Sequence, residues 1–222
     1  DIADLTGAFE KVPHTYIADG HHRSASGATV GRRRRDANPD HTGEESYNTF
    51  LSVFFPHDQM MILDYNRVVL DLNGLTAEQL IERIGDKFTC APTDAPKPAK
   101  EHSFGMYLKG RWYSLVARDG SFDPEDPVNR LDVAILQDNL LSPILGIGDP
   151  RTDNRIDFVG GIRGMEELER RVNEIGEGVA FSMYPTPIEQ LMAIADAGKV
   201  MPPKSTWFEP KLRSGLVVKP LD

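Results

Sequence analysis

Residues 16–28 read Tyr-Ile-Ala-Asp-Gly-His-His-Arg-Ser-Ala-Ser-Gly-Ala, an apolar pair followed by a glycine turn and a run of small residues. This order predicts a short buried strand at Tyr16 and Ile17, a turn at Gly20 and a helix that begins directly after the turn. A helix that starts in this way points unpaired backbone N–H groups and the positive end of its dipole at whatever lies before it. The stretch therefore favours an anionic ligand, and phosphate is the expected anion.

The charged side chains of this stretch sharpen the expectation. Arg23 would add a bidentate fork to a bound phosphate, and His22 would add a further donor. Asp19 would repel a phosphate unless a metal ion or an incoming hydroxyl lay between them, which favours phosphate chemistry over phosphate storage. A strand-to-helix junction also often carries an Asp cap with partly exposed basic neighbours, and spacing alone does not choose between the two interpretations.

Several segments resemble a bacterial and archaeal family known as domain of unknown function family 1015. The two ends of the resemblance are residues 18–25 and the tail 201–211, which reads Met-Pro-Pro-Lys-Ser-Thr-Trp-Phe-Glu-Pro-Lys. Four further segments between these ends resemble the family, namely residues 64–69, 150–153, 156–161 and 180–186. The resemblance thus covers essentially the whole chain.

Members of this family resemble the ParB and sulfiredoxin superfamily, which includes free-serine kinases with a similar Asp-Gly-His-His-Arg motif. Residues 20–23 match the Gly-Cys-His-Arg phosphate loop of sulfiredoxin, except that His21 stands where the nucleophilic cysteine would be. Sulfiredoxin chemistry is therefore excluded. A kinase reaction follows only by analogy, because one fold hosts many activities.

The resemblance implies roles for the individual residues of the loop. Asp19 would activate an acceptor hydroxyl or help to hold Mg²⁺, and His21 is the second catalytic candidate. The nucleotide, ATP or ADP, would be contacted through its phosphates by Gly20, His22, Arg23 and Ser24. The chain begins at Asp1 without an initiator Met, and family members carry a long segment before this motif, which in the serine kinases holds a catalytic glutamate. We therefore expect the C-terminal portion of a larger protein, with half of an active site.

Hydrophobic periodicity predicts an α+β fold of mixed sheets with flanking helices. Residues 1–90 are expected to form a partial ParB/sulfiredoxin-like phosphate-loop portion, and residues 100–222 an α/β portion that either stands alone or packs with the first. The proline-rich residues 90–100 are the expected boundary. Strands are expected at residues 49–55, 62–72, 104–108, 112–117, 156–159, 179–183 and 206–208, and helices at 76–88, 131–141, 165–175 and 186–198. Capping boxes are expected at Thr76 and Thr186.

Four more residues could complete a site as substrate-binding groups. Arg67 is expected on a strand, where a positive charge points either to a ligand or to a buried acid. Lys204 and Ser205 follow a rigid Pro-Pro turn that would present Lys204 to a phosphate or a carboxylate, or that simply leads into a strand. Asp157 precedes two glycines, which allow either close approach of a ligand or a tight strand exit.

Composition limits the partners. A net charge of −9 and a pI near 5.2 disfavour nucleic acid, including ParB-like DNA binding. The one basic cluster, residues 32–35, is expected to be the solvated C-terminal end of the helix that follows the phosphate loop. Cys90 is the only cysteine, and no apolar run reaches the length of a membrane span, so we expect a cytoplasmic protein without membrane contact. Its oligomeric state stays open.

Two function classes remain. The first is a Mg²⁺-dependent phosphotransferase, a small-molecule kinase that acts on a small hydroxylated metabolite such as serine. The second is a regulatory or interaction module in which the same loop binds a nucleotide without turnover. The sequence does not decide whether the protein is an enzyme.

Overall fold

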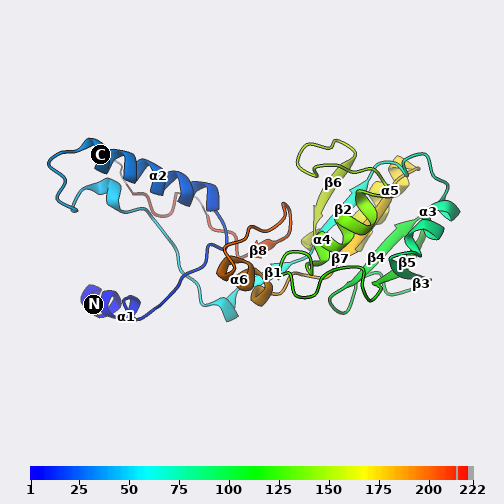
Figure 1. The fold of residues 1–222 in the computed structure, drawn as a ribbon, viewed down its shortest axis with the longest axis horizontal. Coiled ribbons are helices and arrows are strands. Elements are labelled where there is room, and N and C mark those ends of the chain that lie inside the picture. The colour runs from blue at the N-terminus through cyan, green and yellow to red at the C-terminus, as the bar shows by residue number, and fades with distance from the viewer. Residues whose placement is uncertain (214, 220–222) are drawn as a thin grey trace. The chain divides into compact units, whose positions relative to one another are not determined.

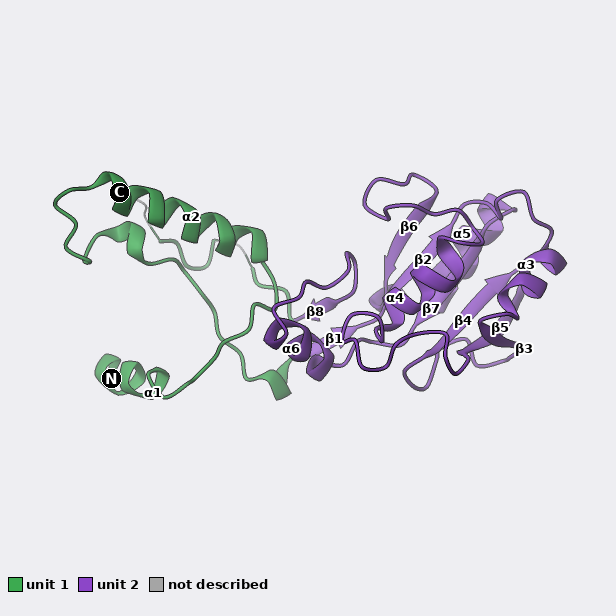
Figure 2. Cartoon of the chain, viewed as in Figure 1, with its two compact units in different colours: residues 1–60, 210–222 green, residues 61–209 purple. Residues whose placement is uncertain are grey.

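The computed structural model describes residues 1–213 and 215–219. The chain forms two compact units, which Figure 2 colours separately. Unit 1 comprises residues 1–60 and 210–222, and unit 2 comprises residues 61–209. The domain boundary that the sequence predicts at residues 90–100 stays a prediction.

Unit 1 consists of helices joined by irregular chain. Its elements are α1 (Ile2–Phe9), α2 (His21–Ala37) and two 3₁₀ turns, η1 (Ser46–Asn48) and η2 (His57–Gln59). The one buried residue of α2 is Gly31, where an added Cβ would lie 2.8 Å from the carbonyl oxygen of Tyr47. A glycine is therefore needed where α2 packs against η1. The exposed arginines 32–35 lie near the C-terminal end of this helix, as the sequence predicted.

Two predicted strands of unit 1 are wrong. Residues 16–17 and 49–55 adopt no regular secondary structure, and Ile17 and Phe54 are exposed. The apolar residues of both segments suit a strand, but a strand also needs a neighbour to accept its backbone hydrogen bonds. The described residues of unit 1 contain no strand that could supply this pairing.

Unit 2 is built on a six-stranded antiparallel sheet (Figure 1). In spatial order its strands are β3 (Phe88–Pro92), β5 (Arg111–Ala117), β4 (Ser103–Leu108), β7 (Val179–Met183), β2 (Tyr65–Val69) and β6 (Ile156–Gly160). A second, two-stranded antiparallel sheet joins β1 (Met61–Leu63) to β8 (Trp207–Glu209). The predicted α+β class and the predicted hairpin of β4 and β5 are confirmed. The strand expected at 62–72 is interrupted at Asp64 and ends at Val69.

Helices cover both faces of the large sheet. They are α3 (Ala77–Ile84), α4 (Asp132–Leu136) with its π-helical continuation η3 (Gln137–Leu141), α5 (Met165–Ile175) and α6 (Ile188–Asp196). Because side chains alternate along a strand, Val68 of β2 packs with Leu168 and Val172 of α5. Val69 belongs to the larger core cluster on the opposite face, which includes Leu80 of α3 and residues of α4. The sheet thus separates two sets of buried side chains.

Of the two capping boxes, one is confirmed and one is wrong. The Thr76 hydroxyl accepts from the Gln79 N–H, and the Gln79 side chain accepts from the Thr76 N–H, as a capping box requires. The Thr186 hydroxyl instead donates to the carbonyl oxygen of Ser205 at 3.1 Å, and α6 begins after Pro187 without a side-chain cap. The Thr186 hydroxyl therefore bonds to a residue far away in sequence and does not cap the helix that the local sequence predicted.

None of the helices in the described residues combines the length and apolar composition that crossing a membrane requires.

Candidate functional site

The first candidate site is the turn that leads into α2 in unit 1. Gly20 adopts a left-handed conformation with φ +73°, and α2 begins at His21 without a side-chain cap. The Gly20 N–H donates to Oδ1 of Asp19 at 2.8 Å. The predicted turn and helix start are therefore confirmed. Because no side chain caps the helix, its first-turn N–H groups are available to a ligand.

Arg23 folds back over this turn. A Cβ added at Gly20 would lie 3.0 Å from Nη2 and 3.3 Å from Nε of Arg23. The Ser24 hydroxyl donates to the Gly20 carbonyl oxygen at 3.3 Å, which ties the first helical turn to the loop. Glycine at position 20 thus serves two purposes, since it accepts the positive φ and leaves room for the guanidinium.

Asp19 has a cationic partner that the sequence did not reveal. Nζ of Lys211 donates to Oδ2 of Asp19 at 3.0 Å, and both side chains are about half exposed. The pKa of Asp19 lies below its ordinary value, chiefly because Lys211 donates this hydrogen bond, with smaller contributions from the Gly20 N–H and the Arg23 charge. The carboxylate is therefore ionised at neutral pH. Lys211 ends the family-like tail, but no spacing rule links it to Asp19.

The two histidines of the loop lie next to each other on the exposed first turn of α2. Their ring centroids are 4.4 Å apart, with the ring planes inclined by 46°. In the described residues there is no group of three His, Cys, Asp or Glu side chains that could hold a metal ion by itself. Mg²⁺ usually binds to one or two carboxylates together with substrate phosphates, so Asp19 with a nucleotide fits that mode of binding.

Three of the four residues predicted to bind substrate come together in unit 2. The Arg67 guanidinium is buried, and its Nη2 donates to the carbonyl oxygen of Lys204 at 3.0 Å, while Nη1 donates to the carbonyl oxygen of Tyr65. Ser205 follows directly, and its hydroxyl donates to the Pro202 carbonyl oxygen at 2.6 Å. Lys204 itself adopts a positive φ of 57°, which is uncommon for a residue with a side chain.

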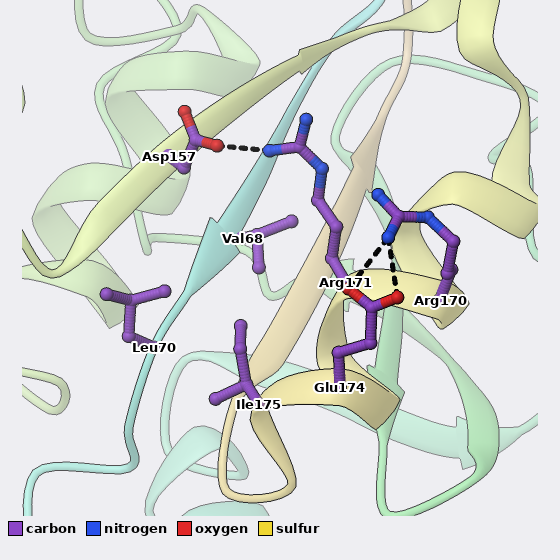
Figure 3. A pocket seen from close by; sticks show the side chains of 7 residues that line it. All are labelled: Val68, Leu70, Asp157, Arg170, Arg171, Glu174 and Ile175. Carbon is purple, nitrogen blue, oxygen red and sulfur yellow. Dashed lines mark hydrogen bonds and ion pairs between the residues drawn. The ribbon is translucent and has the colours of Figure 1, made fainter.

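Asp157 lies apart from these three residues. It pairs with Val68 across β2 and β6, and so lies on the α5 side of the sheet, whereas Arg67 pairs with Phe158 on the opposite side. Figure 3 shows its carboxylate bonded to Arg171, beside a second ion pair between Arg170 and Glu174. These residues line a cavity of about 370 Å³. Asp157 is thus part of a surface ion-pair network of α5.

A further cavity of unit 2 was not predicted from the sequence. It measures about 450 Å³ and lies between residues 101–102, the segment 122–130 and the start of α6. Glu101 accepts from the Gln190 side chain at 2.7 Å, and nearby Asp132 accepts from the His102 N–H at 2.8 Å. Burial, with a further contribution from the Glu101 charge, raises the pKa of Asp132 to about 7. No local motif marks these residues, which converge only through the fold.

Comparison with known proteins identifies relatives of the chain. The model of the family described as "Protein of unknown function (DUF1015)" matches residues 1–134, which confirms the family seen in the sequence. The family-like segments after residue 134 lie outside this match. No protein with a curated description matches the chain.

Solved structures that resemble the chain share little of its sequence. One is a conserved hypothetical protein from Pyrococcus furiosus, which is 16% identical, with a TM-score of 0.44 over 89% of this chain and 72% of that one. Another is a free serine kinase variant in complex with ADP, 17% identical, with a TM-score of 0.44 over 89% and 70% of the two chains. A third is a free serine kinase in complex with AMP, also 17% identical, with a TM-score of 0.41 over the same shares.

Proposed function

The chain belongs to the family of proteins of unknown function DUF1015, and from this premise we propose that residues 19–24 bind the phosphates of an adenine nucleotide, ATP or ADP. The observation that carries the proposal is the left-handed Gly20 at the uncapped start of α2, with the Arg23 guanidinium folded over it. Such a turn offers backbone N–H groups, a helix dipole and a planar fork to the same anion.

The side chains of the loop support phosphate rather than a neutral ligand. Arg23 and His22 supply donors on the exposed first turn, and Lys211 adds a positive charge on the other side of Asp19. Because Lys211 already neutralises Asp19 in part, a phosphate would meet less repulsion there than the sequence suggested. The similarity of residues 20–23 to the sulfiredoxin phosphate loop agrees with this assignment.

We further propose that the complete protein is a phosphotransferase acting on a small hydroxylated metabolite. The acceptor hydroxyl oxygen would form a bond to the terminal phosphorus, the bond between that phosphorus and the leaving nucleotide oxygen would break, and the hydroxyl proton would pass to Asp19. His21 would orient the acceptor, while Arg23 and the N–H groups of the turn would hold the phosphate. Mg²⁺, when bound with the nucleotide, would neutralise phosphate charge next to Asp19.

One observation favours the alternative of a nucleotide-binding regulatory module without turnover. The hydrogen bond from Lys211 keeps the pKa of Asp19 below its ordinary value, which weakens the carboxylate as a proton acceptor. For catalysis, Lys211 would have to leave Asp19 when the nucleotide binds. As a regulatory module, the protein would keep the pair intact in both states.

Calorimetric titration tests the nucleotide proposal. ATP, ADP and CTP are titrated with and without Mg²⁺ into the chain, into Arg23→Ala and into Arg33→Ala, which removes the same charge from an exposed position of the same helix. We expect binding of the adenine nucleotides that Arg23→Ala abolishes and that Arg33→Ala keeps. Binding that survives Arg23→Ala, or that Arg33→Ala weakens equally, would contradict the assignment of the loop.

A further inference from the structure

Arg67 and Lys204 are two cations of unit 2 that lie against the same aromatic ring. Cζ of Arg67 lies 5.6 Å from the centroid of the Phe158 ring, and Nζ of Lys204 lies 5.8 Å from the same centroid. Within the part of the chain that the structure describes, neither side chain makes an ion pair with a carboxylate. Two positive charges thus share one ring without a carboxylate between them.

The buried charge of Arg67, which has no direct ion-pair partner among the described residues, has an energetic consequence. The residue is only 4% exposed, and its guanidinium donates to two backbone carbonyl oxygens, which satisfy donors but carry no full negative charge. Burial therefore lowers the pKa of Arg67 to about 10, and Tyr65 and Asp132 only partly oppose this effect. A buried charge without a direct ion-pair partner is costly, and an anion bound nearby would reduce that cost.

Aromatic side chains surround the two cations. Tyr65 lies two residues before Arg67 on β2, and Phe158 pairs with Arg67 from β6, so all three side chains lie on one face of the sheet. Trp207 of β8 meets Tyr65 edge-on at a centroid distance of 5.5 Å. Its ring lies on Gly160, where a Cβ would be 2.8 Å from it. The three aromatic residues are partly exposed, so a ligand has access to them.

Lys204 is the group that an external ligand would reach first. Its side chain is exposed, its Nζ lies 3.4 Å from the Tyr65 hydroxyl, and it lies 5.6 Å from the centroid of that ring. Among the described residues, the partners of this ammonium are a long hydrogen bond and two ring faces, which are weak partners for an exposed cation. A carboxylate would form a stronger, charge-assisted bond with it.

We propose that the cluster of Tyr65, Arg67, Phe158, Lys204 and Trp207 binds a small organic anion with a planar ring, whose carboxylate meets the Lys204 ammonium and whose ring lies on Trp207 and Phe158. A single carboxylate suits the site because Lys204 is the only exposed cation among these five residues. The buried Arg67 adds a positive potential that also favours an anion. This site lies within unit 2 and does not depend on the nucleotide loop of unit 1.

Three probes of the same shape and different charge test the proposal, namely benzoate, benzyl alcohol and benzylamine. Each is titrated into the full chain while tryptophan fluorescence is recorded, which reports on Trp207 because Trp112 is buried and bonded to Glu169. The test variant is Lys204→Gln. Lys109→Gln is its matched control, since Lys109 is also an exposed lysine with positive φ, 48°, but lies on the β4–β5 turn.

We expect saturable binding of benzoate that Lys204→Gln weakens by about tenfold or more, that Lys109→Gln leaves unchanged and that added salt reduces. We expect no saturable binding of benzyl alcohol. The absence of benzoate binding, an equal response to benzyl alcohol, or benzoate binding unchanged in Lys204→Gln would each overturn the proposal. Tighter binding of benzylamine would also overturn it, because the cluster would then be a cage for ammonium groups. Nucleotide titrations of Arg23→Ala do not enter this test, so the two proposals fail separately.

Discussion

Lys211 donates a 3.0 Å hydrogen bond to Asp19, although 192 positions of sequence separate the two residues. The pair brings the C-terminal tail of unit 1 to the turn that starts α2 and adds a cation to a motif that otherwise ends at Arg23. Asp19 could act as a base, as a metal ligand or as a purely structural group. Each role depends on whether Lys211 keeps its hydrogen bond to the carboxylate.

Replacement of Lys211 by Gln should raise the pKa of Asp19 toward its ordinary value, because the largest cause of the lowered pKa is removed. The titration of the Asp19 carboxyl carbon, followed by NMR from pH 2 to 7, measures this change. Lys11→Gln, an exposed lysine of the same unit, is the control. A carboxyl pKa that stays low in Lys211→Gln would mean that the Gly20 N–H and Arg23 alone hold it down.

The Asp19→Asn variant should bind nucleotide in the absence of Mg²⁺ as tightly as the unchanged chain or more tightly, since a charge that repels phosphate is removed. Phosphotransfer by the complete protein should be abolished. Calorimetry and an assay of nucleotide turnover measure the two effects, with Asp36→Asn at the far end of α2 as control. Loss of Mg²⁺-free nucleotide binding in Asp19→Asn would contradict the role given to this carboxylate.

Gly20→Ala should destabilise the start of α2 by about 1 kcal/mol or more, because alanine is strained at positive φ and its Cβ would displace Arg23. Nucleotide affinity should fall with it. Gly27→Ala is the matched control, since its nearest contact, Phe50, lies at 3.9 Å and alanine favours the helix. Urea unfolding and calorimetry distinguish the two variants. Equal behaviour of both would show that the left-handed turn has no special role.

The partly buried Asp132 predicts a stability that decreases with rising pH. Its folded pKa of about 7 lies above the unfolded value near 3.8, so the folded state binds more protons between these pH values. The free energy of unfolding should therefore fall as the pH rises from about 4 through 7. Asp132→Asn should remove much of this dependence, which is of the order of a few kcal/mol, whereas the exposed Asp138→Asn should not. Urea unfolding at pH 5 and pH 8.5 measures the change in the free energy of unfolding. If this change is the same in Asp132→Asn, Asp132 is not its cause.

The features that were predicted correctly are those that neighbouring residues determine. The left-handed turn at Gly20, the capping box at Thr76 and the hairpin of β4 and β5 each depend on a few consecutive residues. Residues 19–24 could be singled out as a candidate site for the same reason.

The features that were missed depend on partners far away in sequence. Residues 49–55 have the composition of a strand but no described strand to pair with, and the Thr186 hydroxyl bonds to Ser205 instead of a helix end. Likewise, Arg67 and Lys204 lie 137 positions apart and meet only because β2 and the segment before β8 are brought together. No periodicity or spacing rule contains such information.

The strand order of the large sheet has a consequence for synthesis of the chain. β3, β4 and β5 pair with near neighbours in sequence and can associate as soon as they leave the ribosome, whereas β2 lies between β6 and β7. Its ladders are complete only after residue 183 has been made. Both edges of β2 are unpaired until β6 has been made, and one edge stays unpaired until β7 has been made, so a nascent chain presents this strand as a binding segment for cellular chaperones.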